Sequence, residues 1–229
     1  MERKQTRKSL YLVLAVILCS VAMMLVDGVL KPQYFVKSAI KVVLFLVIPA
    51  IYFVINREER SELKRIFTPK GKSLWVSLGL GVLLYGVIVG GYFLLRKSFD
   101  FSGIAGKLTA DTGVSVENFL WVSLYISLVN SFLEELFFRG FGFLILKRTA
   151  SSKFAFLFSA HMFALYHSGM TVGYYHFGVF ALILFALFVA GGFFNYLCQK
   201  SKNLYASWFV HMFANFGINT VGFILFGVL

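Results

Sequence analysis

Two adjacent carboxylates lie in the middle of an apolar segment of this sequence. Glu134 and Glu135 occur in the run Asn-Ser-Phe-Leu-Glu-Glu-Leu-Phe-Phe-Arg-Gly, which starts at Asn130 and contains Arg139. An ionised side chain at the centre of a bilayer costs about 2.5 kcal/mol or more, even on insertion scales. Two carboxylates there therefore indicate a functional site, in which a carboxylate can accept and release a proton.

Candidate polar partners occur in two other apolar segments, at a similar depth. Glu134, His167 and Asn215 each lie thirteen or fourteen residues from the lysine at the basic end of their own segment. In a helix this separation is about 20 Å, and His211 lies one turn nearer that end than Asn215. Three helices would thus present polar groups at one level of the membrane, which predicts a shared site.

Helical phase separates the roles of these residues. Residues four apart share one face of a helix, so Glu135 can pair with Arg139, and His211 projects together with Asn215. Glu134 points about 100° away from Glu135 and is left for chemistry. A satisfied internal ion pair is an equally good interpretation of Glu135 and Arg139. An isolated polar residue in a membrane helix often makes only an interhelical hydrogen bond.

The composition predicts a polytopic membrane protein. Of 229 residues, 59% are hydrophobic and 14% are charged, against about 25% charged residues in soluble domains. Apolar runs of this length are typical of membrane-spanning helices, so we expect an all-α bundle of about seven spans with the site inside it. The expected helices are 9–29, 37–55, 73–95, 116–146, 153–171, 174–198 and 203–227.

The basic residues follow the loops between these helices. The formal net charge is +12, but loop lysines and arginines are explained by topology and anionic lipid, so no nucleic-acid partner is expected. The N-terminal eight residues and the loops near 57–72, 147–153 and 200–202 are more basic than the alternate loops. This asymmetry predicts a cytosolic N-terminus. On this basis the outer segments hold only Lys31, Lys37, Lys41, Arg96, Lys97 and Lys107.

Three motifs in order along the chain resemble those of the CPBP family of intramembrane proteases (CAAX protease and bacteriocin-processing enzymes). They are Glu134-Glu135-x-x-x-Arg139, Phe163-x-x-x-His167 and His211-x-x-x-Asn215. The resemblance covers about 116–220, which we expect to be the catalytic core of a single membrane domain spanning 1–229. The three N-terminal spans, 9–95, are similar to the family only in being apolar.

The resemblance implies a peptidase whose site is buried in the bundle and opens to the cytosol. Glu134 would be the general base that activates water, and His167 would help to hold that water. His211 and Asn215 would stabilise the oxyanion, with Glu135 and Arg139 as support. No metal is expected, because the motif H-E-x-x-H is absent; the alternative is zinc bound by Glu134, His167 and His211.

The resemblance also implies the partners and the location. Substrates would be membrane-proximal, and in some cases lipidated, proteins or peptides, with membrane lipids as the surroundings. A short, basic chain is more similar to bacterial members, which predicts a multi-pass protein of the plasma membrane. The competing interpretation is a non-catalytic scaffold or bacteriocin-immunity protein of the same fold. A proton-coupled transporter is a weaker alternative, because no repeat or broken-helix pattern supports it.

Overall fold

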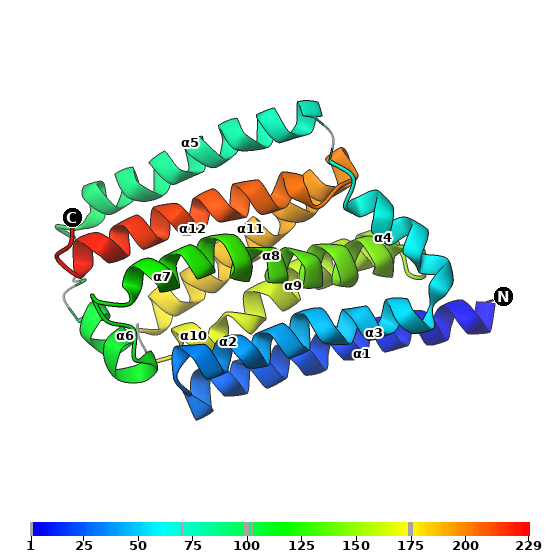
Figure 1. The fold of residues 1–229 in the computed structure, drawn as a ribbon, viewed down its shortest axis with the longest axis horizontal. Coiled ribbons are helices and arrows are strands. Elements are labelled where there is room, and N and C mark those ends of the chain that lie inside the picture. Colours follow the sequence, from blue (N-terminus) through cyan, green and yellow to red (C-terminus); the bar gives the residue numbers. More distant parts are fainter. Residues whose placement is uncertain (1, 70, 99–100, 102, 174–175) are drawn as a thin grey trace.

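The computed structural model describes residues 2–69, 71–98, 101, 103–173 and 176–229, and within them it contains helices and no strands. The long helices run side by side as one bundle, with the two chain termini at opposite ends (Figure 1). The predicted all-α polytopic bundle is confirmed. Lys70 and the first residues of the predicted span 174–198 lie outside the described residues.

The first part of the chain forms three long helical rods and a short connecting helix. Two of the rods contain wide π-helical turns, called η1 and η2 here, and η3 is a short 3₁₀ turn. The elements are α1 (Glu2–Leu25), η1 (Val26–Leu30), α2 (Tyr34–Val42), η2 (Val43–Val47), α3 (Ile48–Ile55), η3 (Arg57–Glu59), α4 (Arg60–Ile66) and α5 (Gly71–Leu95).

The second part of the chain contributes the centre of the bundle. A 30-residue rod from Phe119 to Arg148 is followed by the 15-residue helix α9, the short helix α10 and two long helices. The elements are α6 (Ile104–Thr112), α7 (Phe119–Leu124), η4 (Tyr125–Asn130), α8 (Ser131–Glu134), η5 (Glu135–Ile145), η6 (Leu146–Arg148), α9 (Ser152–Tyr166), α10 (Ser168–Thr171), α11 (Phe177–Ser201) and α12 (Tyr205–Leu225).

The predicted number of spans has to be corrected from seven to six. Within the described residues, six helices are long and apolar enough to cross a membrane. The segment predicted at 153–171 is not among them, because α9 has 15 residues, or about 22 Å, against a hydrocarbon core of about 30 Å. The helix is interrupted at His167 and continues as α10. Together α9 and α10 still run from one end of the bundle to the other, so the chain termini lie at opposite ends (Figure 1).

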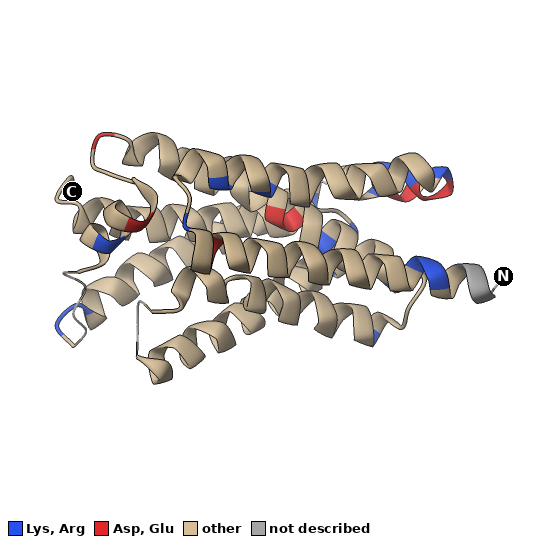
Figure 2. Ribbon diagram, turned by 90° about the horizontal axis from the view of Figure 1, so that it is seen from below, with Lys and Arg blue, Asp and Glu red and all other residues tan. Residues whose placement is uncertain are grey.

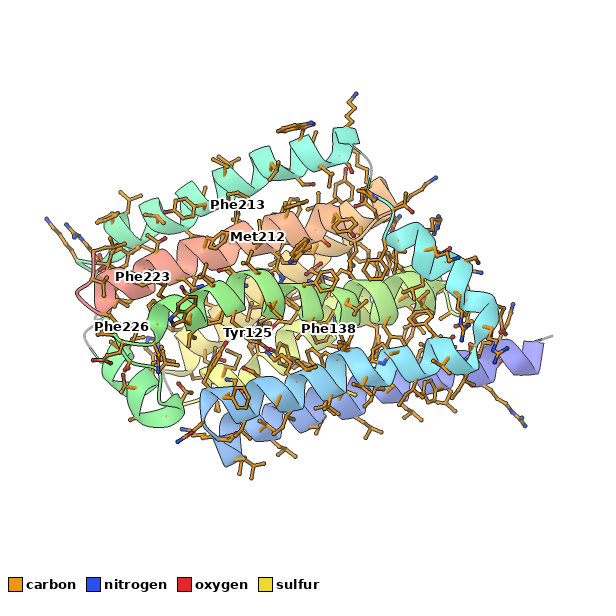
Figure 3. The ribbon with its side chains drawn as sticks, viewed as in Figure 1. Tyr125, Phe138, Met212, Phe213, Phe223 and Phe226 are labelled. Carbon is orange, nitrogen blue, oxygen red and sulfur yellow. The ribbon has the colours of Figure 1, made fainter. Side chains whose placement is uncertain are left out.

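The core lies around η5, whose eleven residues are all buried. Aromatic rings from four elements meet there, and the ring of Phe45 stacks on Phe137 with centroids 4.2 Å apart. The ring of Phe138 meets Phe163 edge to face at 5.5 Å, near the middle of the bundle (Figure 3). Such pairs are worth about 0.5–1.5 kcal/mol beyond their buried area, so η5 is held rigidly with respect to α2–η2 and α9.

Charged residues gather toward the ends of the bundle, but acidic residues also lie in its middle (Figure 2). At the end that carries the N-terminus, Arg148 pairs with Glu59 at 2.9 Å and with Glu62 at 3.2 Å. At the other end, Lys31 pairs with Asp111 at 2.9 Å. The acids in the middle are Glu134 and Glu135, whose side chains are buried.

A glycine contact fixes the segment that follows His167. A Cβ atom on Gly169 would lie 2.6 Å from the carbonyl oxygen of Met24 and 2.9 Å from its Cα. Helix α10 therefore packs backbone to backbone against the end of α1. Since both neighbours are main-chain atoms, neither can move aside as a side chain would.

We expect Gly169→Ala to destabilise the protein by about 1–3 kcal/mol, the usual cost of overpacking. The matched control is Gly86→Ala on α5, where nothing lies within 4 Å of the added Cβ and a gain of about 0.5–1 kcal/mol is expected from helix propensity. Unfolding of the purified protein in detergent micelles measures both. Equal stability of the two variants would contradict the proposed backbone contact.

Candidate active site

Glu134, at the end of α8, is 2% exposed and has one carboxylate oxygen held by three donors. Oε1 accepts hydrogen bonds from Asn130 Nδ2 at 2.8 Å and Tyr166 Oη at 2.9 Å. Lys41 Nζ lies 3.3 Å from the same oxygen. These donors come from η4, α9 and α2, so three separate elements fix the position of one carboxylate.

The other oxygen of Glu134 faces two histidines. Oε2 lies 3.8 Å from His167 Nε2 and 3.7 Å from His211 Nε2. Both distances exceed that of a hydrogen bond, and at such separations a water molecule can connect the groups. His167 lies at the C-terminal cap of α9, and His211 lies in the first half of α12.

The remaining nitrogen of each ring defines its tautomer. His167 Nδ1 lies 2.7 Å from the carbonyl oxygen of Phe163. His211 Nδ1 lies 3.0 Å from Glu135 Oε1. A carbonyl or carboxylate oxygen only accepts, so Nδ1 carries the proton in both rings. In its neutral form each ring therefore presents an Nε2 lone pair toward Glu134.

Glu135 connects His211 to the predicted partner Arg139. Arg139 Nη1 lies 3.4 Å from Glu135 Oε1, and both side chains are 0% exposed, which confirms the predicted pairing. The guanidinium also contacts the rings of Phe163 and Phe194, at 4.0 and 5.0 Å from their centroids. Because the His211 ring stacks on Phe194 at 5.0 Å, the pair also positions this histidine.

Of the four residues predicted to share the site, three meet. Glu134, His167 and His211 converge, although they belong to α8, the end of α9 and α12. The fourth, Asn215, donates through Nδ2 to the carbonyl oxygen of Ile126 at 3.1 Å. That carbonyl lies eight residues before Glu134 on the same rod, so Asn215 ties α12 to η4. One amide hydrogen of Asn215 is left for another acceptor.

Lys41 was not among the predicted site residues. Lys37 and Lys41 were both expected in an outer segment, but both are buried within the span Tyr34–Ile55. Lys37 pairs with Asp27 at 2.6 Å, and Lys41 contacts Glu134. The sequence did contain a signal for Lys41. Two lysines at the start of an apolar run are intramembrane cations, and such cations require partners. Tyr166 was missed because a tyrosine beside a predicted site residue carries no special signal.

Glu134, His167 and His211 carry the types of ligand atom that zinc prefers. Two imidazole nitrogens and a carboxylate oxygen are common zinc ligands, and the lone pairs described above face one space. Ligands at about 2.0–2.2 Å from a tetrahedral ion lie about 3.3–3.6 Å from one another. Glu134 Oε2 lies slightly farther than this from His167 Nε2 and His211 Nε2, at 3.8 and 3.7 Å. Among the described residues, no group of three or more histidine, cysteine or acidic side chains has the geometry of a metal site.

Residues 116–217 match the family model for type II CAAX prenyl endopeptidases, Rce1-like. The match covers all three motifs, and the predicted resemblance is confirmed over this region. It supports a CAAX-protease-like endopeptidase activity within the membrane. Together with the six candidate spans, it indicates a multi-pass membrane protein with protein substrates at the membrane. No curated protein and no solved structure matches the chain.

We expect Arg139→Met to destabilise the protein by about 3–5 kcal/mol, because it leaves Glu135 buried without a compensating charge. In the double variant Glu135→Gln/Arg139→Met no charge remains, and much of this loss should be recovered. Unfolding in detergent micelles gives both values. A double variant as unstable as the sum of the single variants would exclude the ion pair as the source of the effect.

Proposed function

We propose that this protein is an intramembrane endopeptidase that hydrolyses a peptide bond with water activated by Glu134. One observation carries the proposal: Glu134 Oε2 faces the Nε2 atoms of His167 and His211 at 3.8 and 3.7 Å. The arrangement suits a carboxylate base with an adjacent water, at a level of the bundle where a peptide bond would be shielded from bulk solvent.

In the proposed reaction, the water between these groups donates one hydrogen to Glu134 Oε2 and the other to His167 Nε2. Its oxygen attacks the carbonyl carbon of the substrate as the first proton passes to Oε2, which gives a tetrahedral intermediate with a negative oxygen. When the C–N bond breaks, the protonated Glu134 returns that proton to the leaving amine. The carboxylate is thereby restored, and one water molecule is consumed.

The oxyanion requires donors, and the tautomers decide which state of His211 can supply one. A neutral ring with the proton on Nδ1 can only accept at Nε2, so His211 donates to the oxyanion only as an imidazolium. Glu135 Oε1 lies 3.0 Å from His211 Nδ1, where its carboxylate would pair with that imidazolium. The second amide hydrogen of Asn215 is the other candidate donor. Glu135 would therefore act through His211.

The proposed substrates are membrane-proximal, and in some cases lipidated, proteins or peptides, cleaved in a bacterial plasma membrane. The proposed orientation has the N-terminus in the cytosol, and the basic loops at its end of the bundle support it. Labelling of single introduced cysteines at Ser61, which is exposed on α4 at the same end as the N-terminus, and at Val228 with an impermeant reagent would test this orientation. Protection of the Ser61 site in intact cells and labelling of the Val228 site would support it.

We expect Glu134→Gln to reduce cleavage by about 10²–10⁴-fold, the usual contribution of a general base. The matched control is Glu117→Gln, an exposed acid on the loop before α7, which should cleave at the wild-type rate. Peptide-terminus proteomics on membranes that contain equal amounts of each protein measures the effect and identifies substrates.

Termini present with the wild type and Glu117→Gln but lost with Glu134→Gln would support proteolysis and reveal the substrate class. Identical termini for all three proteins would contradict it. If Glu134→Gln also preserved the biological activity, the scaffold or immunity interpretation would replace the protease.

The proposed chemistry uses no metal. We expect cleavage by the purified protein to be unchanged after dialysis against a zinc chelator. Elemental analysis should find far less than the one zinc per chain that a required cofactor would give. Loss of activity on chelation, with recovery on addition of zinc, would instead assign Glu134, His167 and His211 as zinc ligands.

A further inference from the structure

Lys41 has an acceptor for each hydrogen of its ammonium group, although it lies inside a membrane span. Nζ lies 2.7 Å from Asn130 Oδ1 and 3.3 Å from Glu134 Oε1, and it also donates to Tyr166 Oη. Its side chain is 5% exposed. Three acceptors stabilise the charged form of a buried amine, because each hydrogen bond offsets part of the cost of desolvation.

The same contacts form a closed network around one oxygen. Asn130 and Tyr166 each accept from Lys41 and donate to Glu134 Oε1. The amide and hydroxyl are thus oriented by the lysine, so that their hydrogens point at the carboxylate. With Oε1 engaged by three donors, Oε2 is the oxygen left toward the histidines.

We infer that Lys41 is a positioning residue that keeps Glu134 ionised and directs Oε2 toward His167 and His211. The inference deepens the proposed function, because a base must be ionised before it can take a proton from water. Four charged or titratable side chains lie against the Glu134 carboxylate: Lys41 from α2, Tyr166 and His167 from the end of α9, and His211 from α12. Tyr34, Tyr125 and Arg139 also interact with it electrostatically.

Loss of the lysine should therefore leave a protonated Glu134. An isolated carboxylate in an apolar interior takes up a proton rather than remaining charged. Asn130 and Tyr166 alone are neutral donors and do not balance its charge. A protonated Glu134 cannot act as the base, and its hydroxyl can turn toward Asn130 or Tyr166, which would also change the orientation of Oε2.

Infrared spectroscopy detects this change without depending on activity. In Lys41→Met we expect a new carboxylic-acid C=O band at neutral pH, and its absence in Lys41→Met/Glu134→Gln assigns it to Glu134. The matched control is Lys37→Met, one helical turn earlier on α2, whose lysine pairs with Asp27 instead. Any carboxylic-acid band that Lys37→Met produces would come from Asp27 and should persist in Lys37→Met/Glu134→Gln. Lys41→Gln, which removes the charge but keeps a donor, is measured in parallel in case Lys41→Met does not fold.

The same variants separate this inference from the proposed function. If the wild type cleaves, the Lys41 variants should lose at least about 100-fold in kcat with little change in KM, while Lys37→Met keeps its activity. A Lys41 variant that is folded but shows no Glu134 acid band overturns the inference and leaves the protease proposal intact. A wild type that cleaves nothing overturns the protease proposal, and the infrared band still decides the role of Lys41.

Discussion

The neutralisation of buried charge is the constraint on which this structure depends. Each ion taken from water into the bundle costs several kcal/mol unless it is paired and hydrogen-bonded. Within the described residues, the membrane spans bury three acids and three bases. These form three pairs from four elements: Asp27 with Lys37 at 2.6 Å, Glu134 with Lys41 at 3.3 Å, and Glu135 with Arg139 at 3.4 Å. The acids and the lysine and arginine side chains buried in the spans therefore balance one another in charge.

Pairing also distinguishes the two neighbouring glutamates. Glu135 pairs with Arg139 and His211, and Arg139 lies against the ring of Phe163. Glu134 receives all its donors on one oxygen and presents the other to the two Nε2 atoms. The aromatic side chains of η5, α9 and α11 form rigid walls around both groups. Two identical side chains, adjacent in sequence, thus acquire different roles from the partners that surround them.

Much of the architecture was predictable, because a bilayer leaves few choices. Every backbone polar group must be paired internally, so long apolar runs become helices. The pairing of Glu135 with Arg139 and the separate direction of Glu134 followed from helical phase alone. The break at His167 was harder to predict, because apolar residues continue through it and only Ser168 and Gly169 mark it. The helix therefore proved too short to count as a span.

What the sequence determined by itself was the helical bundle, the similar depth of Glu134 and His167 with His211 within one turn of it, and the pairing within one helix, because these depend on composition and on distance along the chain. What the tertiary structure decided was the partner of each buried group. Lys41 lies 93 residues from Glu134 along the chain, and only the packing of α2 against the central rod brings them together. Asn215 was also expected at the depth of Glu134, but its amide donates to the carbonyl oxygen of Ile126, eight residues before Glu134 on the central rod. Periodicity places a residue on a helix, whereas packing determines which other helix it faces.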